Sequence, residues 1–231
     1  MAHSSPFHGL NALIETYGMI PPGSTVLCAC SGGADSVYLL HRLYLLRERM
    51  GFRLAAAHYN HQLRGEESQR DEDFVVQWCG PAQVDGHELP GVPLYVGRGD
   101  VAAQAGELGR GLEETAREMR YAFLRETAAE LGGALIATAH TADDNGETIL
   151  LHLLRGSGLR GLTGIRPVGE GLIRPMLTTT RAQVEEYLRL YGLPHVEDSS
   201  NQDTVYARNR LRQEVMPVLR DLNPAFVSTL A

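Results

Sequence analysis

The sequence contains no lysine, because all 21 of its Lys+Arg residues are arginines. This excludes a Walker-type phosphate loop, which requires a lysine directly before its serine or threonine. The three cysteines form no C-x-x-C pair, so a zinc ribbon is excluded and a disulfide framework is disfavoured. No apolar run reaches about eighteen residues, and the first ten residues lack the pattern of a signal peptide. These absences predict a soluble, cytoplasmic protein with no membrane partner.

The length of 231 residues and the hydrophobic content of 43% are sufficient for one large α/β domain. Short apolar runs alternate along the chain with segments of helical periodicity. We predict strands at 25–30, 54–58, 93–96, 134–139 and 172–174, and helices at 35–50, 68–79, 112–131, 143–154 and 181–191. The alternation predicts a doubly wound, mostly parallel sheet with helices on both faces and ligand sites at the C-terminal ends of the strands.

Three local patterns give further structural predictions. Cys28 and Cys30 alternate within the first strand, and we expect both to be small buried core residues. Segment 81–90 carries Gly, Pro and charge without periodicity, which indicates a surface loop. In the helix at 112–131 we predict one buried stripe, formed by Leu112, Ala116, Met119, Phe123, Thr127 and Leu131.

The most informative segment of the sequence is Ser31-Gly32-Gly33-Ala34-Asp35-Ser36, which joins the first predicted strand to the first predicted helix. Two glycines allow a sharp turn whose N–H groups approach a ligand, and the helix dipole favours an anion there, so we predict a phosphate site. In place of a lysine, we expect the hydroxyls of Ser31 and Ser36, arginines, and a divalent cation on Asp35. The alternative is an ordinary glycine turn with a helix cap.

Three carboxylates, Asp143, Asp144 and Glu147, crowd the start of another predicted helix, directly after a strand. Asp143 and Glu147 lie one turn apart on the same face, which is typical of a cation or amine site. In the simpler alternative, Thr141 and Asp144 form a capping box and the acids complement the helix dipole. We favour a functional role, because this is the ligand-binding edge of the predicted sheet.

Charge is distributed unevenly along the chain. Residues 1–154 hold 11 arginines against 20 acidic residues, whereas residues 155–220 hold 10 arginines against 7 acidic residues. The basic C-terminal third is therefore a candidate for contacts with phosphates, and a solvated charged surface is the alternative.

Several spaced motifs together resemble those of the tRNA(Ile)-lysidine synthetases, a family of PP-loop ATP pyrophosphatases. In chain order, they lie at 31–36, 57–64, 114–124, 140–148, 154–162, 174–177, 197–201 and 208–212. The chain departs from the family pattern at Cys28, Cys30, Thr141 and the pair Asn145-Gly146, none of which removes a carboxylate. The resemblance implies a sheet of the adenine nucleotide α-hydrolase type.

The activity implied by the resemblance is that of a ligase which joins free lysine to the wobble cytidine of tRNA(Ile) with a CAU anticodon, using ATP and Mg²⁺. An adenylated cytidine is the intermediate and lysidine is the product. The implied ATP-binding residues are Ser31, Gly32, Gly33, Ala34, Asp35, Ser36, His58, His61 and Arg117. Catalysis falls to Asp35, Asp144 and Glu147, metal binding to Asp35 and Asp144, and lysine binding to Asp144 and Glu147. The candidates for tRNA binding are Arg155, Arg160, Arg208 and Arg210. For His58 and His61 a zinc pair is the alternative, although no further ligand stands near them in the sequence.

We expect three regions: a lead-in at 1–23, a PP-loop catalytic domain at 24–180, and a helical part of the same domain at 181–231. The chain stops where the resembled family continues into C-terminal tRNA-binding domains, so we expect a catalytic part alone. Three rival functions stay open: a tRNA cytidine thiolase, an ammonia-dependent synthetase, and a nucleotide-binding module without catalysis. The thiolase would need cysteines that carry sulfur or a cluster, and the synthetase has no use for the arginine-rich third.

Overall fold

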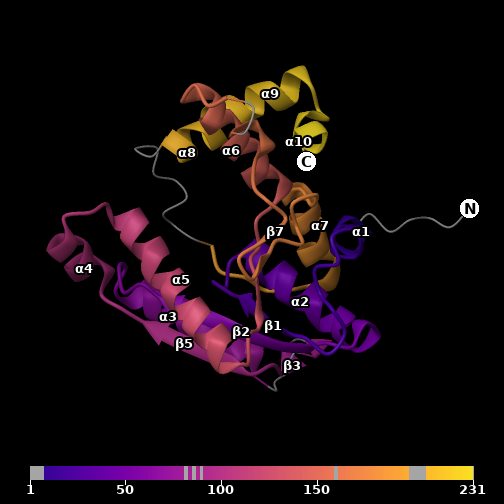
Figure 1. Ribbon diagram of the computed structural model, residues 1–231, viewed down its shortest axis with the longest axis vertical. Coiled ribbons are helices and arrows are strands. Elements are labelled where there is room, and N and C mark those ends of the chain that lie inside the picture. Colours follow the sequence, from indigo (N-terminus) through magenta and orange to yellow (C-terminus); the bar gives the residue numbers. More distant parts are fainter. Residues whose placement is uncertain are drawn as a thin grey trace, which may run out of the picture.

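A six-stranded sheet organises the computed structural model, which describes residues 8–80, 83–84, 87–88, 91–158, 161–197 and 207–230 (Figure 1). The strand order is β5-β2-β1-β6-β8-β7. Neighbouring strands are parallel except for the β7–β8 pair, which is antiparallel. The bounds are β1 Thr25–Ala29, β2 Arg53–Asn60, β5 Leu94–Arg98, β6 Leu135–Ala137, β7 Val168–Gly169 and β8 Leu172–Ile173. The predicted doubly wound, mostly parallel sheet is therefore confirmed.

Side-chain alternation along β1 separates two hydrophobic cores, because successive residues of a strand face opposite sides of a sheet. Val26, Cys28 and Cys30 belong to the larger core, and Leu27 belongs to the smaller one. All three cysteines are free and buried, which confirms the prediction for Cys28 and Cys30. The larger core is covered by α1 His8–Thr16, α2 Ala34–Met50, α3 Glu66–Cys79 and α7 Arg181–Tyr191.

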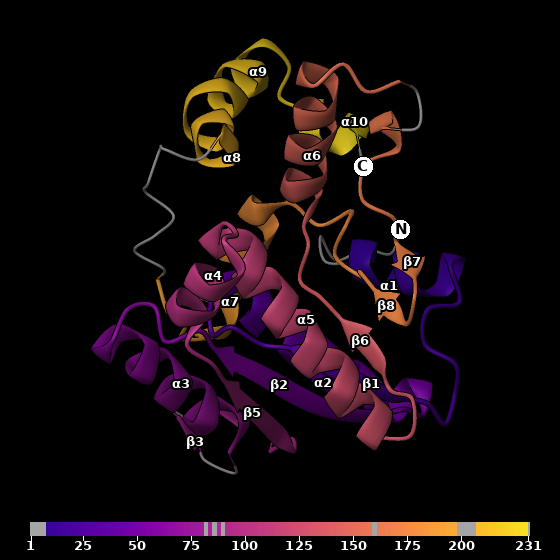
Figure 2. The same ribbon diagram turned by 60° about the vertical axis from the view of Figure 1, so that its left-hand side comes forward.

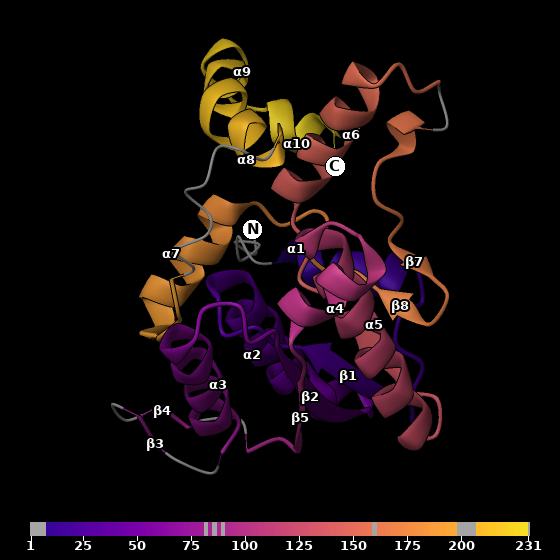
Figure 3. The same cartoon turned by 90° about the vertical axis from the view of Figure 1, so that its left-hand side faces the viewer.

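The opposite face of the sheet is covered by α5 Leu112–Glu130 (Figure 3). The predicted stripe on this helix was wrong at Leu112, which is 46% exposed. Phe123 and Leu131 of the predicted stripe do pack against the smaller core, and Thr127 is buried. The buried apolar residues of this face are Tyr121, Leu124 and Ala128, with the spacing of three and four residues expected of one helix face. Before α5 lies a helix absent from the sequence prediction, α4 Val101–Leu108, whose N-terminus is capped by the side chain of Asp100.

Segment 81–90 was predicted to be a surface loop. Four of its residues form a small antiparallel ladder, β3 Gln83–Val84 with β4 His87–Glu88. The other six residues of the segment lie outside the described part of the chain.

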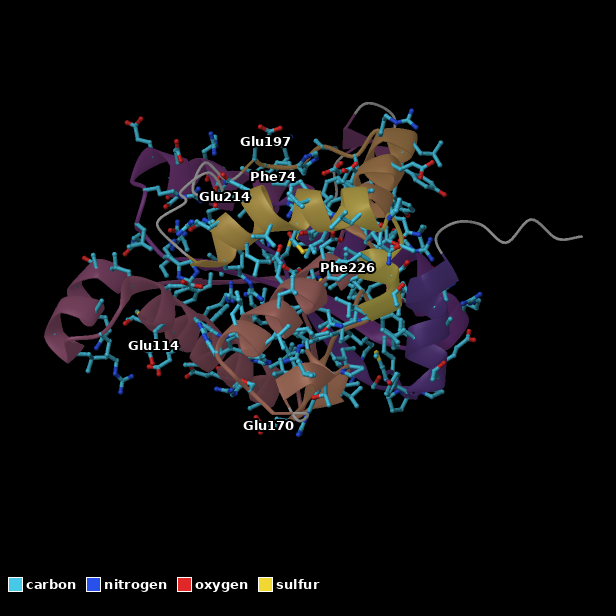
Figure 4. The ribbon with its side chains drawn as sticks, turned by 90° about the horizontal axis from the view of Figure 1, so that it is seen from above. Phe74, Glu114, Glu170, Glu197, Glu214 and Phe226 are labelled. Atoms are coloured by element: carbon cyan, nitrogen blue, oxygen red, sulfur yellow. The ribbon has the colours of Figure 1, made fainter. Side chains whose placement is uncertain are left out.

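A third cluster of buried residues lies away from the sheet, and we call the part of the chain around it the helical module. It contains α6 Ala142–Leu154, the short turn η1 Gly161–Thr163, α8 Ala207–Arg210, the π-helical turn η3 Leu211–Val215, α9 Met216–Leu222 and α10 Phe226–Leu230. Ala142, Leu211, Met216 and Val227 form its centre, and Phe226 on α10 packs against them. Figure 2 shows α8 and α9 beside α6, and Figure 4 labels Phe226 in the same group of helices.

The strand order reverses at β1: the chain proceeds outward through β2 and β5, then returns to place β6 on the other side of β1. Ligands of such sheets bind in the crevice at this reversal, beyond the C-terminal ends of the strands. Both informative segments of the sequence begin there, because residues 31–36 follow β1 and the acidic start of α6 follows β6. Among the described residues, no helix is both long and apolar enough to cross a membrane.

Candidate active site

Residues 31–36 form a tight turn, which we call the glycine loop, between β1 and α2. Gly32 has a φ of 89°, in the left-handed region that disfavours other residues. A Cβ atom on Gly32 would also lie 3.1 Å from the Phe74 ring and 3.2 Å from a Val75 methyl group. Val196 adds a backbone restraint, because its N–H donates to the carbonyl of Gly32 at 2.9 Å. Backbone conformation and close packing therefore both require glycine at this position.

The Ser36 hydroxyl holds the glycine loop together. Its oxygen accepts from the N–H of Ser31 at 3.2 Å and of Gly32 at 3.1 Å, and it donates to the carbonyl of Gly33 at 2.8 Å. Gly33 is the N-cap of α2 and provides no side-chain cap. The N-terminus of this 17-residue helix therefore presents N–H groups and a positive dipole end toward the strand edge, which suits an anion.

Asp35 lies in the first turn of α2 with one oxygen, Oδ1, buried and without a hydrogen-bond partner. Its other oxygen, Oδ2, is 3.8 Å from Arg181 Nη2. Burial raises the pKa of Asp35 to about 6; Arg181 opposes the rise, and the charges of Asp144 and Asp143 add to it. An orphaned carboxylate oxygen is the type of donor that a hard divalent cation prefers. Asp35 therefore fits the predicted Mg²⁺, whereas both oxygens of Asp144 already accept hydrogen bonds, from Thr141 and Arg212.

The two candidate histidines differ in their surroundings. His58 is buried, and its Nδ1 lies 2.9 Å from the carbonyl oxygen of Cys30. Burial lowers the pKa of His58. His61 is only half-buried, and its Nδ1 has no hydrogen-bond partner. Burial, together with the charge of Arg120, lowers the pKa of His61 to about 4, so its ring is neutral near pH 7.

Asn60 anchors the turn that carries His61, a role that the sequence analysis missed. Its side-chain nitrogen donates to Glu72 Oε2 at 3.0 Å, and its oxygen accepts from the N–H of Gln62 at 2.9 Å. Glu72 also accepts from Arg98 Nε at 2.9 Å. The hydrogen bonds from Arg98 lower the pKa of Glu72 to about 2, against the effect of burial. The only sequence signal was that Asn60 lies in the motif at 57–64.

The acidic start of α6 contains the capping box considered as the simpler alternative. The Asp144 side chain accepts from the N–H of Thr141 at 2.9 Å, and the Thr141 hydroxyl accepts from the N–H of Asp144 at 3.2 Å. The third carboxylate of the group, Asp143, accepts from the backbone N–H of Arg181 at 2.7 Å and from the Arg220 side chain. Helix capping thus explains part of this cluster, and the remaining carboxylate oxygens meet arginines.

Glu147 is the most deeply buried carboxylate of the group, with only 1% of its surface exposed. Arg212 donates through Nε to Glu147 Oε1 at 2.6 Å and through Nη2 to Oε2 at 3.0 Å. The same Nη2 donates to Asp144 Oδ1 at 3.1 Å. Arg208 Nε lies 3.2 Å from Glu147 Oε2 without forming a hydrogen bond, and Arg208 Nη2 donates to the Thr148 hydroxyl at 2.7 Å.

The candidate tRNA-binding arginines therefore differ in position. Arg208 contacts Glu147 and Thr148 of its own chain, as above. Arg210 is exposed and pairs with Glu214 at 3.3 Å on the surface of the C-terminal helices (Figure 4). Arg155 is exposed at the C-terminus of α6, and Arg160 lies outside the described residues. The sequence analysis did not single out Arg212, whose pairing with Glu147 joins positions that only the fold brings together.

A second group of cationic side chains lies on α5. Arg117 lies on α5 with its guanidinium 4.7 Å from the ring centre of Tyr121, and Arg120 also stacks near this ring. Burial lowers the pKa of His140 to about 4, with Asp144 opposing the change and Arg174, Arg117 and Arg120 adding to it. The described residues contain no group of three His, Cys, Asp or Glu side chains able to hold a metal ion by themselves.

Comparison with known sequences places these features in a family. Residues 8–219 match the PP-loop domain. The chain is 46% identical over 226 residues to the tRNA(Ile)-lysidine synthase of Dehalococcoides mccartyi, covering 94% of this chain and 46% of that protein. It is 39% identical over 224 residues to the synthase of Parabacteroides distasonis, covering 97% of this chain and 48% of that protein. The chain thus spans about half the length of the curated relatives it matches.

Comparison with solved structures supports the same fold at low sequence identity. A U34-tRNA thiolase from Methanococcus maripaludis, solved with its 4Fe-4S cluster, is similar with a TM-score of 0.77 and 14% identity, covering 96% of this chain and 76% of that one. An ammonia-dependent NAD synthetase from Campylobacter jejuni is similar with a TM-score of 0.50 and 14% identity, covering 96% of this chain and 87% of that one. At these identities the likeness shows the fold alone.

Proposed function

The chain belongs to the PP-loop family of ATP-binding domains, and on that basis we propose that it catalyses the ATP-dependent joining of free lysine to the wobble cytidine of tRNA(Ile). In the first step the cytosine carbonyl oxygen attacks the α-phosphate of ATP, and pyrophosphate leaves. In the second step the side-chain amine of lysine attacks the ring carbon that carries the adenylated oxygen. AMP leaves with that oxygen, the amine loses a proton, and lysidine is formed.

One observation carries this proposal: an anion site and a carboxylate-rich site lie close together, because Arg181 is 3.8 Å from Asp35 and donates its backbone N–H to Asp143 at 2.7 Å. The glycine loop and the N-terminus of α2 provide the first, and Asp144 and Glu147 provide the second. Asp35, in the first turn of α2, is near enough to the second site for the charges of Asp144 and Asp143 to raise its pKa. This arrangement suits a reaction in which a phosphate ester and an ammonium group must meet.

Each binding residue has a physical task in the proposed reaction. The glycine loop binds the phosphates of ATP, and neutral His61 contacts the nucleotide at the end of β2. A magnesium ion held by Asp35 and Asp144 would supply positive charge against the departing pyrophosphate. Arg117 and Arg120 stabilise negative charge on the opposite side of the crevice. Glu147 and Asp144 bind the lysine ammonium and assist its deprotonation, because only a neutral amine is a nucleophile.

The thiolase alternative receives no support from the cysteines. Cys28, Cys30 and Cys79 are buried core residues, and burial raises the pKa of each thiol. A thiol with a raised pKa is a poor nucleophile and a poor ligand for a cluster. The likeness to a thiolase therefore extends to the fold of the sheet and not to sulfur chemistry.

The proposal is tested by measuring AMP release from labelled ATP in the presence of a tRNA(Ile) transcript and each amino acid in turn. We expect release with lysine and not with ammonium or sulfide. A transcript whose wobble cytidine is replaced by uridine is the matched control and should give no release. Release that depends on another amine or on sulfide, or that is independent of RNA, would contradict the proposal.

A further inference from the structure

The carboxylates of the proposed metal and amine sites, and Asp143 beside them, are already paired with arginines of the same chain. Arg181 lies beside Asp35, and Arg220 beside Asp143. Arg212 pairs with both Asp144 and Glu147, and Arg208 with Glu147. Four carboxylates thus face four guanidinium groups within the described residues. We call Arg208 and Arg212, which approach the two carboxylates proposed to bind the amine, the arginine clamp.

Resting on the proposed function, we propose that the arginine clamp occupies the ammonium site of the substrate and must move away before the amine can bind. We infer further that phosphate-bearing ligands draw the clamp away, so that the amine site opens only after a phosphate group has bound. The clamp is then an autoinhibitory contact that orders the two halves of the reaction.

At Glu147 the clamp and the substrate amine compete for one carboxylate. Both carboxylate oxygens are taken: Oε1 accepts from Arg212 at 2.6 Å, and Oε2 accepts from Arg212 at 3.0 Å and lies 3.2 Å from Arg208. Each oxygen has a further lone pair, but Glu147 is only 1% exposed, so a ligand can reach these lone pairs only by displacing atoms that cover them. An ammonium group donates to the same lone pairs as a guanidinium. The substrate amine can therefore reach Glu147 only by replacing one of the clamp residues.

The position of the clamp allows this replacement. Both arginines lie on the short segment α8–η3, which packs on α6 through the small helical core rather than through the sheet. The side chains of Arg208 and Arg212 are 39% and 27% exposed, so each guanidinium can turn toward solvent about its own side-chain bonds. Arg208 Nε is buried without a hydrogen bond, which makes Arg208 the less firmly held of the two. The segment also contains a π-helical turn, a feature frequent at functional sites.

Phosphate is the ligand chemistry that competes best for these side chains. A guanidinium group matches a phosphate oxyanion with two parallel hydrogen bonds, as it does a carboxylate. Two sources of phosphate reach this crevice in the proposed reaction, the nucleotide and the RNA backbone. Both would transfer a clamp arginine from Glu147 to phosphate and leave a carboxylate pair with the negative charge that an ammonium requires.

The experiment is the equilibrium binding of lysine to the 231-residue chain, measured by calorimetry, with Arg212→Gln as the principal variant. If the clamp competes with the amine, removing Arg212 should strengthen lysine binding by about tenfold or more, because the fraction of open sites rises. Arg189→Gln is the matched control, since it removes an exposed arginine of α7 that has no assigned binding role. Arg212→Lys should bind lysine weakly, because the new ammonium keeps the site occupied. Unchanged or weaker lysine binding by folded Arg212→Gln would overturn the proposal.

Two further measurements separate the possible causes. Melting curves establish that each variant is folded. Arg208→Gln leaves the Arg212 hydrogen bonds intact, so it provides a milder second test with a smaller expected increase in lysine affinity. Wild-type protein should bind lysine more tightly with a non-hydrolysable ATP analogue or with a tRNA(Ile) transcript than without either, and the two arms distinguish nucleotide phosphate from RNA phosphate. If neither raises lysine affinity, the inferred opening by phosphate is refuted.

Butylammonium distinguishes a failure of the clamp from a failure of the proposed function. This ion carries the ammonium group of lysine without its amino-acid end. If Arg212→Gln gains affinity for butylammonium and for lysine alike, and binds lysine no more tightly than butylammonium, the clamp is supported and the lysine assignment is wrong. If the variant gains affinity for neither ion, the clamp is refuted, whereas the lysine-dependent release of AMP still decides the function.

Discussion

Replacing Ser36 by alanine should disorganise the glycine loop as well as weaken ATP binding. The Ser36 hydroxyl makes three hydrogen bonds within the loop, two accepted from N–H groups and one donated to a carbonyl. It is also 5% exposed, so water cannot readily replace these bonds. At a net value of about 1 kcal/mol for each bond, the loss is ~3 kcal/mol of unfolding free energy. For a chain of this size, that lowers the melting temperature by about 6–12 °C.

Ser31→Ala is the matched control for this prediction, because Ser31 lies in the same loop and also carries a hydroxyl. That hydroxyl accepts one long bond, from the N–H of Gly33 at 3.4 Å, and lies 3.3 Å from the Ser36 hydroxyl. Ser31 is also exposed, so its truncation should cost about 0.5 kcal/mol or less. Urea titration of both variants measures the difference in unfolding free energy.

The same pair of variants should differ in ATP affinity. In Ser36→Ala the loop must be ordered when the nucleotide binds, and each ~1.4 kcal/mol spent on ordering weakens binding tenfold. We therefore expect a loss of at least about tenfold in Ser36→Ala, measured by calorimetry with a non-hydrolysable ATP analogue. Equal stability losses in the two variants, or wild-type affinity in Ser36→Ala, would refute the role of Ser36 as the centre of the loop.

Three further predictions concern the carboxylates. Asp35 has a pKa raised from 3.8 to about 6, so its contribution to stability is present below pH ~4 and lost as pH rises through ~6. The melting temperature of Asp35→Asn should therefore depend less on pH between pH 4 and 7 than that of the wild-type protein. Parallel pH profiles of the melting temperature in the two proteins would contradict this. Glu72→Ala should weaken ATP binding several-fold by releasing the turn that Asn60 holds beside His61. Asp73→Ala, on the same helix but exposed, should not. Glu147→Gln should raise the KM for lysine while RNA adenylation survives; loss of adenylation with unchanged lysine dependence would place Glu147 on the nucleotide side.

Local sequence patterns were sufficient to predict the elements that build the sheet. The predicted strand at 25–30 is observed at Thr25–Ala29, and the predicted helix at 181–191 is observed with the same ends. These elements have strong signals, namely a continuous apolar run in the first and a capping box at Thr180 in the second. The helix α4, only eight residues long, was missed although Asp100 before it and Gly109 after it are typical capping residues.

Long-range pairing explains what the sequence did not reveal. In α5, apolar residues occur on more than one face, so periodicity alone could not tell that Tyr121 and Leu124 meet the sheet while Leu112 faces solvent. Glu147 and Arg212 are far apart in the sequence, and nothing local distinguishes Arg212 from an arginine on a solvated face. The assignments of ATP, lysine and RNA to individual residues stay predictions, which the variants above address.

The path of the chain between the sheet and the helical module limits how the protein can be divided. After β6 the chain enters the module as α6, returns to the sheet as β7 and β8, and continues into α7 before it enters the module again as α8. Between α6 and α8 in the sequence, α7 places fully buried Tyr187 against Tyr38 of α2, with ring centres 4.8 Å apart. A cut after residue 180 would therefore remove part of the main core together with the C-terminal helices. A protease cut in the connection between α7 and α8 should instead give two fragments that stay associated.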